Sequence, residues 1–574
     1  MRETPGSPGN GLLLPLAAVV AGLLGLLWLT GVISAGLFGT GWTPLTPSQL
    51  IATAIRLPAH LGEPRAAWPA GMRRALPAAL GFYSALALVL VVALMVTASI
   101  GRLFSPRLFH GLQRPDQGRP ASARWARSSD LRALHVKRAE AGRLTLGCHG
   151  RQLLAAEPRQ SVVVVAPSQS WKTTGLAVPA LLEWAGPAIA TSVKTDLLRD
   201  TLERRRQLGA VMVFDPAQVT GLTQHVVRAT PLTSCNTWRG ALRVGNWLAT
   251  AARPASHGLE DADFWFAAAE KLLAPLLFAA RSGGLTMADV VRFLDEGPFA
   301  EEEVSLLLET AGDPAAKQAW RATWNREERQ RSSIYTTAET ILAAFADPRV
   351  VEASTGADYT PARLLDGRSN TLYLCAPAHE QQRLRPLFSM MVRELLAVVY
   401  ESAAATGKPI DPSLLLVLDE AANIAPIPNL DEIASTGAGQ GIQILSVFQD
   451  LAQLRSRYGE RAQTIVNNHR AKIFGTGMSD PETLSYVTRV VGAGEFQQQS
   501  QTAGELGRSS TTEATTYREL TPANVVREAQ PGTGLLIYGH LPPAKVRLRP
   551  WYRDRGLRRL AEEEPSSRMD RLHA

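Results

Sequence analysis

Two long runs without charged residues dominate the hydrophobic pattern near the N-terminus. No Asp, Glu, Lys or Arg occurs at 11–38, which reads GLLLPLAAVVAGLLGLLWLTGVISAGLF, and none occurs at 75–101. A helix needs about 20 apolar residues to cross the hydrocarbon core of a bilayer. The pattern therefore predicts two transmembrane helices at these positions. A cleaved signal peptide is the alternative for the first run, but its apolar part would be shorter and no second span would follow.

The charges beside these runs predict how the chain lies in a membrane. Residues 102–143 hold ten Lys or Arg and three acids, which is the excess typical of a cytoplasmic flank. We therefore expect a two-span protein of the plasma (inner) membrane with both termini in the cytoplasm. Residues 1–10 would be the cytoplasmic N-terminus, 39–74 an extracytoplasmic loop and 102–143 a basic juxtamembrane linker. The loop itself carries arginines, which argues mildly against this orientation.

From about residue 144 the pattern changes to short apolar runs separated by helical stretches. Continuous apolar runs of this length predict buried parallel strands, with helices covering both faces of the sheet. The runs are Ser161–Ala166, Ala188–Ser192, Val211–Phe214, Thr371–Ala376, Leu414–Leu418 and Ile442–Phe448. We therefore expect an α/β core with a mainly parallel sheet, built from residues 144–254 and 347–550.

Three other stretches interrupt or follow this core. Residues 255–346 have a helical period and few strand signals, so they are expected to form an inserted all-α domain. The polar stretch 497–517 has no apolar periodicity and predicts a loop. The mixed-charge tail 551–574 is expected to fray.

Composition adds little beyond a class of protein. The 574 residues carry a formal charge of +8, with 45% hydrophobic and 20% charged residues, which excludes a wholly disordered chain. The three cysteines are far apart and form no CxxC pair, so neither a disulfide framework nor a multi-cysteine zinc site is supported. The modest basic excess favours an anionic partner only weakly.

The first apolar run of the core leads into a candidate phosphate-binding loop. Residues 161–184 read SVVVVAPSQSWKTTGLAVPALLEW, a buried strand, a short loop and then a helix, which is the context of a P-loop. In such a loop the backbone N–H groups cradle phosphates, the lysine reaches the terminal phosphates and the hydroxyl holds Mg²⁺. We assign these two roles to Lys172 and Thr173. The candidate nucleotide-binding residues are Ser168, Gln169, Ser170, Trp171, Lys172, Thr173 and Thr174.

The loop departs from the P-loop pattern GxxxxGK[ST] at both glycines. Ala166 stands at the first glycine and Trp171 at the second. Glycine allows a strained turn and a close approach of the backbone to phosphate, whereas an indole takes up room and disfavours a positive φ. By itself this motif does not separate a P-loop from an ordinary strand–turn–helix with a surface lysine.

Two later strands strengthen the assignment. The run SLLLVLDEAA ends in Asp419 and Glu420, the Walker B arrangement in which one carboxylate holds Mg²⁺ and the next polarises the attacking water. The alternative is that the two acids cap the next helix. The run GIQILSVFQD ends in Gln449, an amide able to bind the γ-phosphate and the water; a plain strand-end amide is the alternative.

Several motifs together resemble one family. The two N-terminal spans, the P-loop strand, the helical insertion, the block LDEAANIAPIPNLDEIASTGAGQGIQILSVFQD and the segment NNHRAKIFGTGMSDPETLSYVTRVVG look like the TraG/TraD-like type IV secretion coupling proteins, of the TraM-recognition-domain type. The resemblance implies a membrane-anchored, RecA-like P-loop ATPase that uses ATP and Mg²⁺ and assembles as a homo-hexamer. It would pass single-stranded DNA bound to a relaxase, or protein substrates, to secretion channel proteins.

Carried over by position, the resemblance implies that Lys172 and Thr173 contact phosphate and Mg²⁺, that Asp419 holds the metal, that Glu420 activates water and that Gln449 senses hydrolysis. Members of this family often carry an arginine shortly before the sensor strand, suited to act on a neighbouring subunit. Here that region reads STGAGQGIQ and has none. Arg470 and Lys472 are the nearest substitutes. The run Arg204–Arg206 is a possible DNA contact, but a solvated helix face explains it equally well.

Three functions therefore remain open. The leading one is a coupling ATPase that moves a DNA or nucleoprotein substrate. The missing glycines motivate a second, a pseudo-ATPase that recruits cargo at the membrane without turning nucleotide over. A DNA translocase of the FtsK type shares the motor core, but the helical insertion and the presence of only two spans favour the coupling protein.

Overall fold

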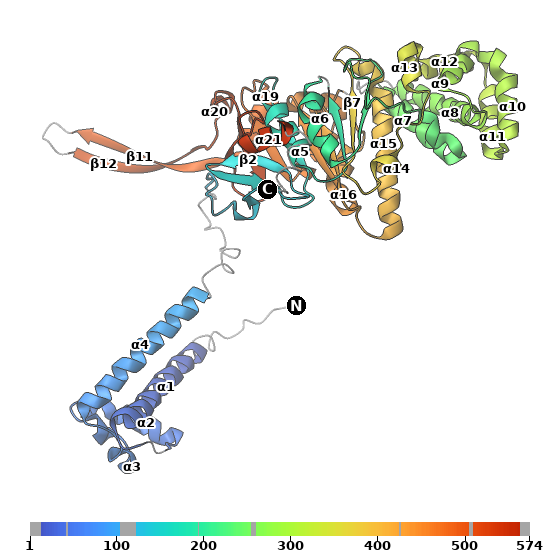
Figure 1. The fold of residues 1–574 in the computed structure, drawn as a ribbon. Coiled ribbons are helices and arrows are strands. Elements are labelled where there is room, and N and C mark those ends of the chain that lie inside the picture. Colours follow the sequence, from blue (N-terminus) through green and yellow to red (C-terminus); the bar gives the residue numbers. More distant parts are fainter. Residues whose placement is uncertain are drawn as a thin grey trace, which may run out of the picture. The chain divides into compact units, whose positions relative to one another are not determined.

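The computed structural model describes residues 13–41, 44–103, 122–192, 195–253, 260–423, 426–503 and 509–562. The chain divides into two compact units, residues 1–121 and 122–574, which we describe separately (Figure 1).

The first unit is helical. Helices α1 (Leu13–Phe38) and α4 (Ala79–Leu103) pack against each other, and short helices connect them: α2 (Pro47–Arg56), 3-10 turns at Leu57–His60 and Pro64–Ala67, and α3 (Ala70–Arg73). A small core around Trp68, Met72 and Phe82 holds the connection against the helices. In the described part of the chain, we find no helix with both the length and the hydropathy of a membrane span. The predicted spans at 11–38 and 75–101 lie partly outside the residues whose side chains are described.

A sheet of twelve strands forms the centre of the second unit. Its order is β1-β3-β2-β14-β13-β10-β4-β9-β8-β5-β7-β6, and the seven strands from β10 to β6 are mutually parallel. The strands are β1 (His135–Val136), β2 (Thr145–His149), β3 (Gln152–Ala155), β4 (Val162–Val165), β5 (Ala188–Ser192), β6 (Val211–Phe214), β7 (Thr371–Cys375), β8 (Leu414–Leu418), β9 (Ile442–Phe448), β10 (Ala471–Gly475), β13 (Thr533–Tyr538) and β14 (Ala544–Arg547). The six predicted strands and the mainly parallel sheet are confirmed.

Both faces of the parallel part are covered, which explains the continuous apolar runs. Along β4, Val163 and Val165 belong to one hydrophobic cluster, whereas Val162 and Val164 belong to the other. One face packs mainly on α7 (Trp238–Ala252), α15 (Gln381–Thr406), α16 (Leu430–Gln440), α17 (Leu451–Tyr458) and α18 (Arg461–Asn468). The other face packs on α5 (Val178–Glu183), α6 (Asp196–Leu208) and α21 (Arg555–Glu562). A strand with two buried faces has no polar side to alternate with.

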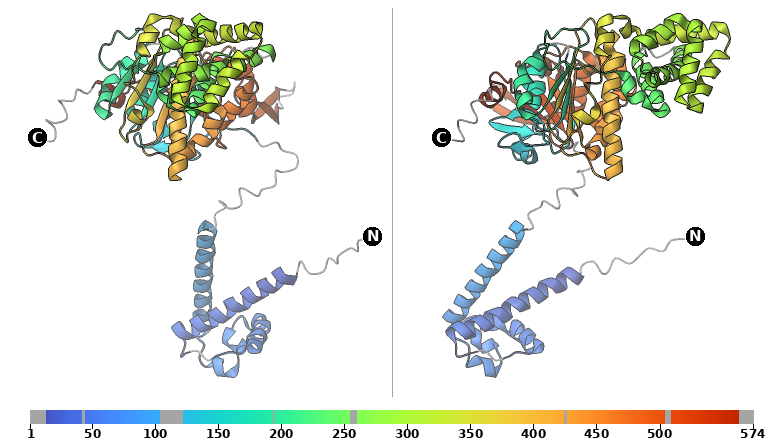
Figure 2. Two further views of the ribbon diagram at one scale, coloured as in Figure 1. Left: turned by 90° about the vertical axis from the view of Figure 1, so that its right-hand side faces the viewer. Right: turned by 45° about the vertical axis from the view of Figure 1, so that its right-hand side comes forward.

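Helices fill the stretch that the helical period predicted. They are α8 (Glu260–Ser282), α9 (Met287–Glu296), α10 (Glu301–Ala311), α11 (Pro314–Trp324) and α12 (Glu328–Ile341), with 3-10 turns at Gly297–Ala300 and Ala343–Ala346. Figure 2 shows them, in green, as a group at one side of the sheet. The long helix α8 lies at their centre and contacts α7, α10, α11 and α12. The remaining helices of the second unit are α13 (Pro348–Ala353), α14 (Pro361–Leu364), α19 (Pro481–Val491) and α20 (Ala523–Arg527).

A hairpin replaces the predicted loop at 497–517. Strands β11 (Ala493–Ala503) and β12 (Ser509–Glu519) pair antiparallel from Ala493↔Glu519 to Ala503↔Ser509, and Figure 1 shows them projecting from the body. The loop prediction depended on the absence of apolar periodicity. A two-stranded ladder outside the core needs only backbone hydrogen bonds, and the threonine-rich sequence favours extended backbone.

Parts of the segments assigned to the linker and to the tail belong to the second unit. Residues 122–143, assigned to the linker by the sequence, contribute β1, which pairs with β3. Residues 551–562, assigned to the tail, contain α21, which packs on α5 and α6. Just before this helix, the N–H of Trp551 donates to the carbonyl of Thr174 at 3.0 Å. The C-terminal segment is therefore attached to the helix that follows the candidate phosphate loop.

Candidate nucleotide-binding site

The candidate site lies at the carboxyl ends of four neighbouring parallel strands, β4, β9, β8 and β5. Ligands of open α/β sheets bind at this edge, because the loops there lead into the covering helices. Lys172 follows β4, Asp419 follows β8 and Gln449 follows β9. Sequence position alone thus placed three predicted residues at one edge.

The loop between β4 and its helix closes on itself. The hydroxyl of Ser170 donates to the carbonyl of Pro167 at 2.7 Å, and the N–H of Gly175 donates to the carbonyl of Trp171 at 2.7 Å. The helix starts with a π-helical turn at Thr173–Ala177, an irregularity found frequently at functional sites. Gln169 and Trp171 adopt left-handed backbone, with φ of 63° and 66°. The tryptophan therefore takes the conformation for which a P-loop normally uses glycine.

Each missing loop glycine is matched by a glycine on another segment. A Cβ built on Gly475, at the end of β10, would lie 2.6 Å from the Cβ of Ala166. A Cβ built on Gly532 would lie 2.2 Å from two carbon atoms of the Trp171 indole. Such distances exclude any side chain at the facing positions unless something shifts. The fold thus makes room for the alanine and the tryptophan.

A cavity of about 200 Å³ lies beside the loop. Most of the predicted site residues line it: Ser168, Gln169, Trp171, Lys172, Thr173, Thr174, Asp419 and Glu420. Two predicted residues are not among its lining residues, Ser170, whose hydroxyl is used inside the loop, and Gln449. Asp196 lines the cavity and was missed. It follows β5 at the same edge of the sheet, a signal that could have identified it.

Lys172 is buried and points its ammonium back along the loop. Its Nζ donates to the carbonyl of Ala166 at 3.2 Å, and the residue is only 7% exposed. Burial lowers the pKa of Lys172, and the nearby acids Asp419, Glu420 and Asp450 oppose this shift. A buried cation with no carboxylate within ion-pair distance in the described structure is suited to an anionic ligand.

Asp419 and Thr173 lie close enough to share a ligand. The Thr173 hydroxyl donates to Oδ2 of Asp419 at 2.9 Å. The other oxygen, Oδ1, is buried and receives no hydrogen bond within the described part of the chain. Burial raises the pKa of Asp419 to about 6, partly offset by the Thr173 hydroxyl and by Lys172. An unsatisfied carboxylate oxygen beside a threonine hydroxyl fits Mg²⁺, which binds proteins through few oxygen ligands and keeps water and phosphate as the others.

Glu420 is held in an unusual backbone conformation. Its φ is 56°, and its Oε2 accepts a hydrogen bond from Nδ2 of Asn423 at 3.3 Å. A non-glycine residue in this region is uncommon, and such residues cluster at active sites. The turn directs the chain away from the strand immediately after Asp419, so that both carboxylates line the same cavity.

Gln449, and the residues Arg470 and Lys472 considered as substitutes for the missing arginine, do not line this cavity. The backbone N–H of Gln449 donates to the side chain of Gln453 at 3.0 Å. Arg470 forms an ion pair with Glu157 at 2.8 Å, and the ammonium of Lys472 donates to the carbonyl of His469 at 2.7 Å. Both cations thus have partners within this chain, which weakens the hypothesis that either would act on a neighbouring copy.

The run Arg204–Arg206 is not a uniform solvated face. Arg205 is fully buried, and its guanidinium donates to the Thr371 hydroxyl and to four backbone carbonyls, those of Leu181, Trp184, Gly186 and Ser369. Arg206 is exposed and pairs with Glu203. The middle arginine therefore has a structural role, and the run is no DNA-binding patch of three equivalent residues.

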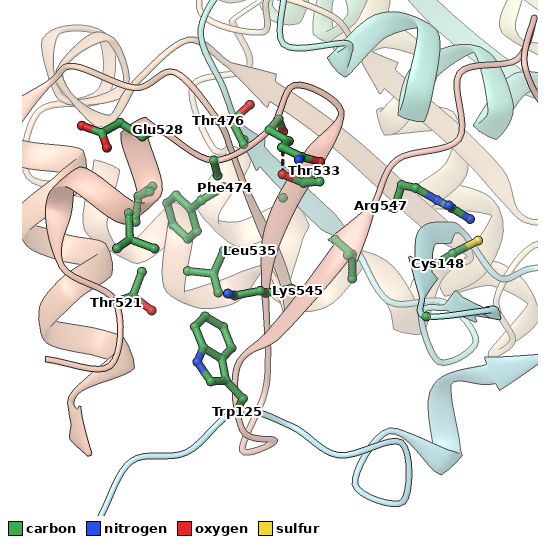
Figure 3. Close-up of a pocket in the computed structure, with 18 residues that line it drawn as sticks. Trp125, Cys148, Phe474, Thr476, Thr521, Glu528, Thr533, Leu535, Lys545 and Arg547 are labelled. Atoms are coloured by element: carbon green, nitrogen blue, oxygen red, sulfur yellow. Dashed lines mark hydrogen bonds between the residues drawn. The ribbon is translucent and has the colours of Figure 1, made fainter. Parts of the chain in front are cut away.

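A larger cavity of about 660 Å³ has Gly475 in its wall but none of the acids or the lysine of the candidate site (Figure 3). Apolar side chains such as Phe474 and Leu535 form much of its wall, and the ammonium of Lys545 lies 4.7 Å from the centre of the Trp125 ring. None of the predicted nucleotide-binding residues lines it. Size alone would thus have pointed to the wrong cavity.

Comparison with known proteins agrees with this geometry. Similar relatives include the conjugal transfer protein TraG of Escherichia coli, 26% identical over 364 residues that cover 58% of this chain and 55% of TraG. Protein VirD4 of Rhizobium rhizogenes is 26% identical over 440 residues, which cover 73% of this chain and 63% of VirD4. The chain therefore matches a little over half of the length of these relatives.

Solved structures of the bacterial conjugative coupling protein TrwB share the fold. The unbound form of TrwBdeltaN70 aligns with a TM-score of 0.57 at 16% identity, over 75% of this chain and 93% of that one. The complex of TrwB with ADP and Mg²⁺ aligns with a TM-score of 0.55 at 18% identity, over 75% and 94%. The shared α/β fold with its mostly parallel sheet supports a RecA-like core.

The family itself follows from the sequence. The model of the family described as type IV secretory system conjugative DNA transfer matches residues 124–571, which is most of the chain and nearly all of its second unit. The P-loop strand, the acidic pair after β8 and the helical insertion all lie within this match. The chain belongs to this family of type IV secretion coupling proteins.

Proposed function

We propose that this protein is a membrane-anchored coupling ATPase that delivers single-stranded DNA with its relaxase, or a protein substrate, to a type IV secretion channel. One observation carries the enzymatic part of the proposal. Lys172, Thr173, Asp419 and Glu420, which come from distant parts of the sequence, line a single cavity. This is the set of groups that phosphoryl transfer requires.

The roles follow from the positions. The Lys172 ammonium and the backbone N–H groups of the loop would bind the β- and γ-phosphates of ATP. The Thr173 hydroxyl and the Asp419 carboxylate would hold Mg²⁺, which neutralises charge on the phosphates when bound. Glu420 would accept a hydrogen bond from the attacking water and orient it. Gln449, one residue beyond β9, would complete the set by sensing the γ-phosphate.

Nucleotide and metal use are supported by the relatives as well as by the cavity. TrwB has been solved with ADP and Mg²⁺ and with non-hydrolysable analogues of ATP and GTP. For this chain we propose ATP as nucleotide and Mg²⁺ as metal. The buried, unsatisfied Oδ1 of Asp419 is the feature of its own structure that favours the metal.

The cargo, the anchor and the assembly belong to the same proposal. The relatives are conjugal transfer and plasmid coupling proteins, which supports DNA with a relaxase as cargo and secretion channel proteins as partners. The charge-free runs at 11–38 and 75–101 support a two-span anchor in the plasma membrane, and the basic flank at 102–143 supports cytoplasmic termini. A homo-hexameric ring would place the catalytic cavity next to a neighbouring subunit.

A nucleotide-binding receptor without turnover is the second candidate, and the loop residues Ala166 and Trp171 motivate it. The steric objection that motivates this candidate is removed, because Gly475 and Gly532 make room for these two side chains. The loop is therefore built around them rather than distorted by them.

The test is ATP hydrolysis by the full-length protein, with and without single-stranded DNA. We expect DNA to stimulate hydrolysis, and Lys172→Ala to lower the rate by about 10² or more, as for other groups that stabilise transition-state charge. The matched control is Lys137→Ala, which removes an exposed lysine and should leave the rate unchanged. Equal rates for the Lys172→Ala protein and the unaltered protein would refute the enzymatic proposal.

A further inference from the structure

A further cavity, called the second cavity below, adjoins the cavity of about 200 Å³ beside the candidate phosphate loop. Its volume is about 440 Å³, and Trp171 lines both cavities. Apart from Cys148, the other lining residues come from the C-terminal part of the chain: Gln530–Thr533, Arg547–Pro550, Arg553 and Asp554. This is within the range of pockets that hold small molecules. A ligand with its phosphates on the loop would reach this second cavity by passing Trp171.

The indole of Trp171 is fixed where the two cavities meet. Gly532 lies against one edge of the ring and leaves no space for a side chain of its own. The guanidinium of Arg553 lies 4.6 Å from the ring centre, a distance typical of a cation–π contact. The C-terminal segment is held in place by the bond from Trp551 to the Thr174 carbonyl. Two planar groups, an indole and a guanidinium, are thus presented together.

The charges of the second cavity favour an anionic ligand. Arg549 is paired with Glu183 at 2.8 Å and with Asp554 at 2.9 Å. Arg547 and Arg553 also line the cavity, and neither has a carboxylate within ion-pair distance among the described residues. Because its arginines outnumber its single acid, this wall attracts a molecule that is anionic as a whole, so a nucleotide whose phosphates lie on the adjoining loop fits better than a neutral metabolite.

We propose that this second cavity binds the base and ribose of the nucleotide, with the base stacked on the Trp171–Arg553 pair. The proposal rests on the proposed function, since it extends the same nucleotide site. It assigns Trp171 a role of its own: the residue that replaces a loop glycine supplies the stacking surface for the base. Base–aromatic stacking contributes roughly tenfold or more to affinity and tolerates different bases, because every base has a π-face.

The opposing view is that Trp171 only fills space between the loop and Gly532. The two views differ in which part of the nucleotide depends on the indole. A space-filling role would act through the loop conformation and affect phosphate binding. A stacking role would affect binding of the base and would not change binding of the phosphates.

The experiment is calorimetric titration of the full-length protein with MgATP and with magnesium tripolyphosphate, which has the phosphates without the nucleoside. The unaltered protein should bind ATP at least about tenfold more tightly than tripolyphosphate. Trp171→Ala should weaken the affinity for ATP by about tenfold and change the affinity for tripolyphosphate by less than about twofold. Trp171→Phe should retain most of the ATP affinity. Trp125→Ala, which alters the cavity of about 660 Å³, should leave both affinities unchanged.

The outcomes separate this inference from the proposed function. If the unaltered protein binds neither ligand, the nucleotide site itself is refuted. If it binds both ligands equally, or if Trp171→Ala weakens both alike, the base subsite is refuted and the phosphate site stands. Arg553→Ala provides a second test that leaves the loop unaltered, and it should also weaken the affinity for ATP but not that for tripolyphosphate. An unchanged ATP affinity would refute the proposed stacking.

Discussion

Thr173 donates its hydroxyl hydrogen bond to Oδ2 of Asp419 at 2.9 Å, although 246 positions separate the two residues. The contact joins the helix after β4 to the end of β8 across the intervening strand β9. It brings together the two side chains assigned to the metal. Because one hydrogen bond joins these two side chains, Mg²⁺ binding would replace that bond and would also satisfy the buried Oδ1.

The raised pKa of Asp419 predicts that this residue costs stability at neutral pH. Its pKa in the folded protein is about 6, above the usual 3.8. Between these values the folded state binds more protons than the unfolded state, so this contribution to stability falls as pH rises from about 4 to about 6. Asp419→Asn should therefore stabilise the metal-free protein at pH 7.5, by at most about 3 kcal/mol.

The measurement is the melting temperature of both proteins, without nucleotide or metal, at pH 4 and at pH 7.5. The difference in favour of the Asn variant should be large at pH 7.5 and small at pH 4. A variant that melts below the unaltered protein at pH 7.5 would contradict the prediction. The same substitution should abolish any effect of Mg²⁺ on nucleotide affinity.

Glu420→Gln should separate nucleotide binding from hydrolysis. The amide keeps the size and the Asn423 contact but has lost the negative charge that polarises water, so the hydrolysis rate should fall by about 10²- to 10⁴-fold. ATP affinity should change by less than about threefold. Rapid-quench kinetics and equilibrium binding measure the two quantities. Glu302→Gln, an exposed substitution on α10, is the control; a comparable loss of rate in that variant would show an unspecific effect.

The pairing of Ala166 with Gly475 predicts a compensating double substitution. Gly475→Ala brings a methyl group to 2.6 Å from the Cβ of Ala166 and should destabilise the protein by about 1 to 3 kcal/mol. ATP affinity should fall as well, because Ala166 begins the phosphate loop. Adding Ala166→Gly should restore most of both losses.

Calorimetric unfolding and ATP titration of the two single variants and the double variant test this coupling. Gly439→Ala is the matched control, since a Cβ there meets nothing within 4 Å and the position lies in helix α16. It should be neutral or slightly stabilising. Additive effects of Gly475→Ala and Ala166→Gly, with no recovery in the double variant, would refute the proposed contact.

Arg205 and Arg206 should respond very differently to the same substitution. Arg205→Ala removes the donor to four backbone carbonyls, most of them in buried hydrogen bonds, and to the Thr371 hydroxyl, which should cost about 3 kcal/mol or more. Arg206→Ala removes one exposed ion pair and should cost less than about 1 kcal/mol. Thermal unfolding compares the two. If DNA affinity fell equally in both variants while stability was unchanged, the result would support Arg204–Arg206 as a DNA contact.

The strands and the chemistry at their ends could be predicted from the sequence. Buried parallel strands leave a continuous apolar run, and the residues after them occupy one edge of the sheet, so Lys172, Thr173, Asp419 and Glu420 could be brought together without coordinates. The helical insertion carries its own 3.6-residue period. These signals are local, because each depends on residues a few positions apart.

The tertiary structure alone decided how the unusual loop is accommodated. No sequence pattern links Gly475 to Ala166 or Gly532 to Trp171, because hundreds of positions separate the residues of each pair. The attachment of Trp551 beside the loop and the burial of Arg205 are equally non-local. Local periodicity fixes which residues form an element and which face is apolar. Whether a residue at one end of the chain leaves room for another depends on packing, which only the folded chain provides.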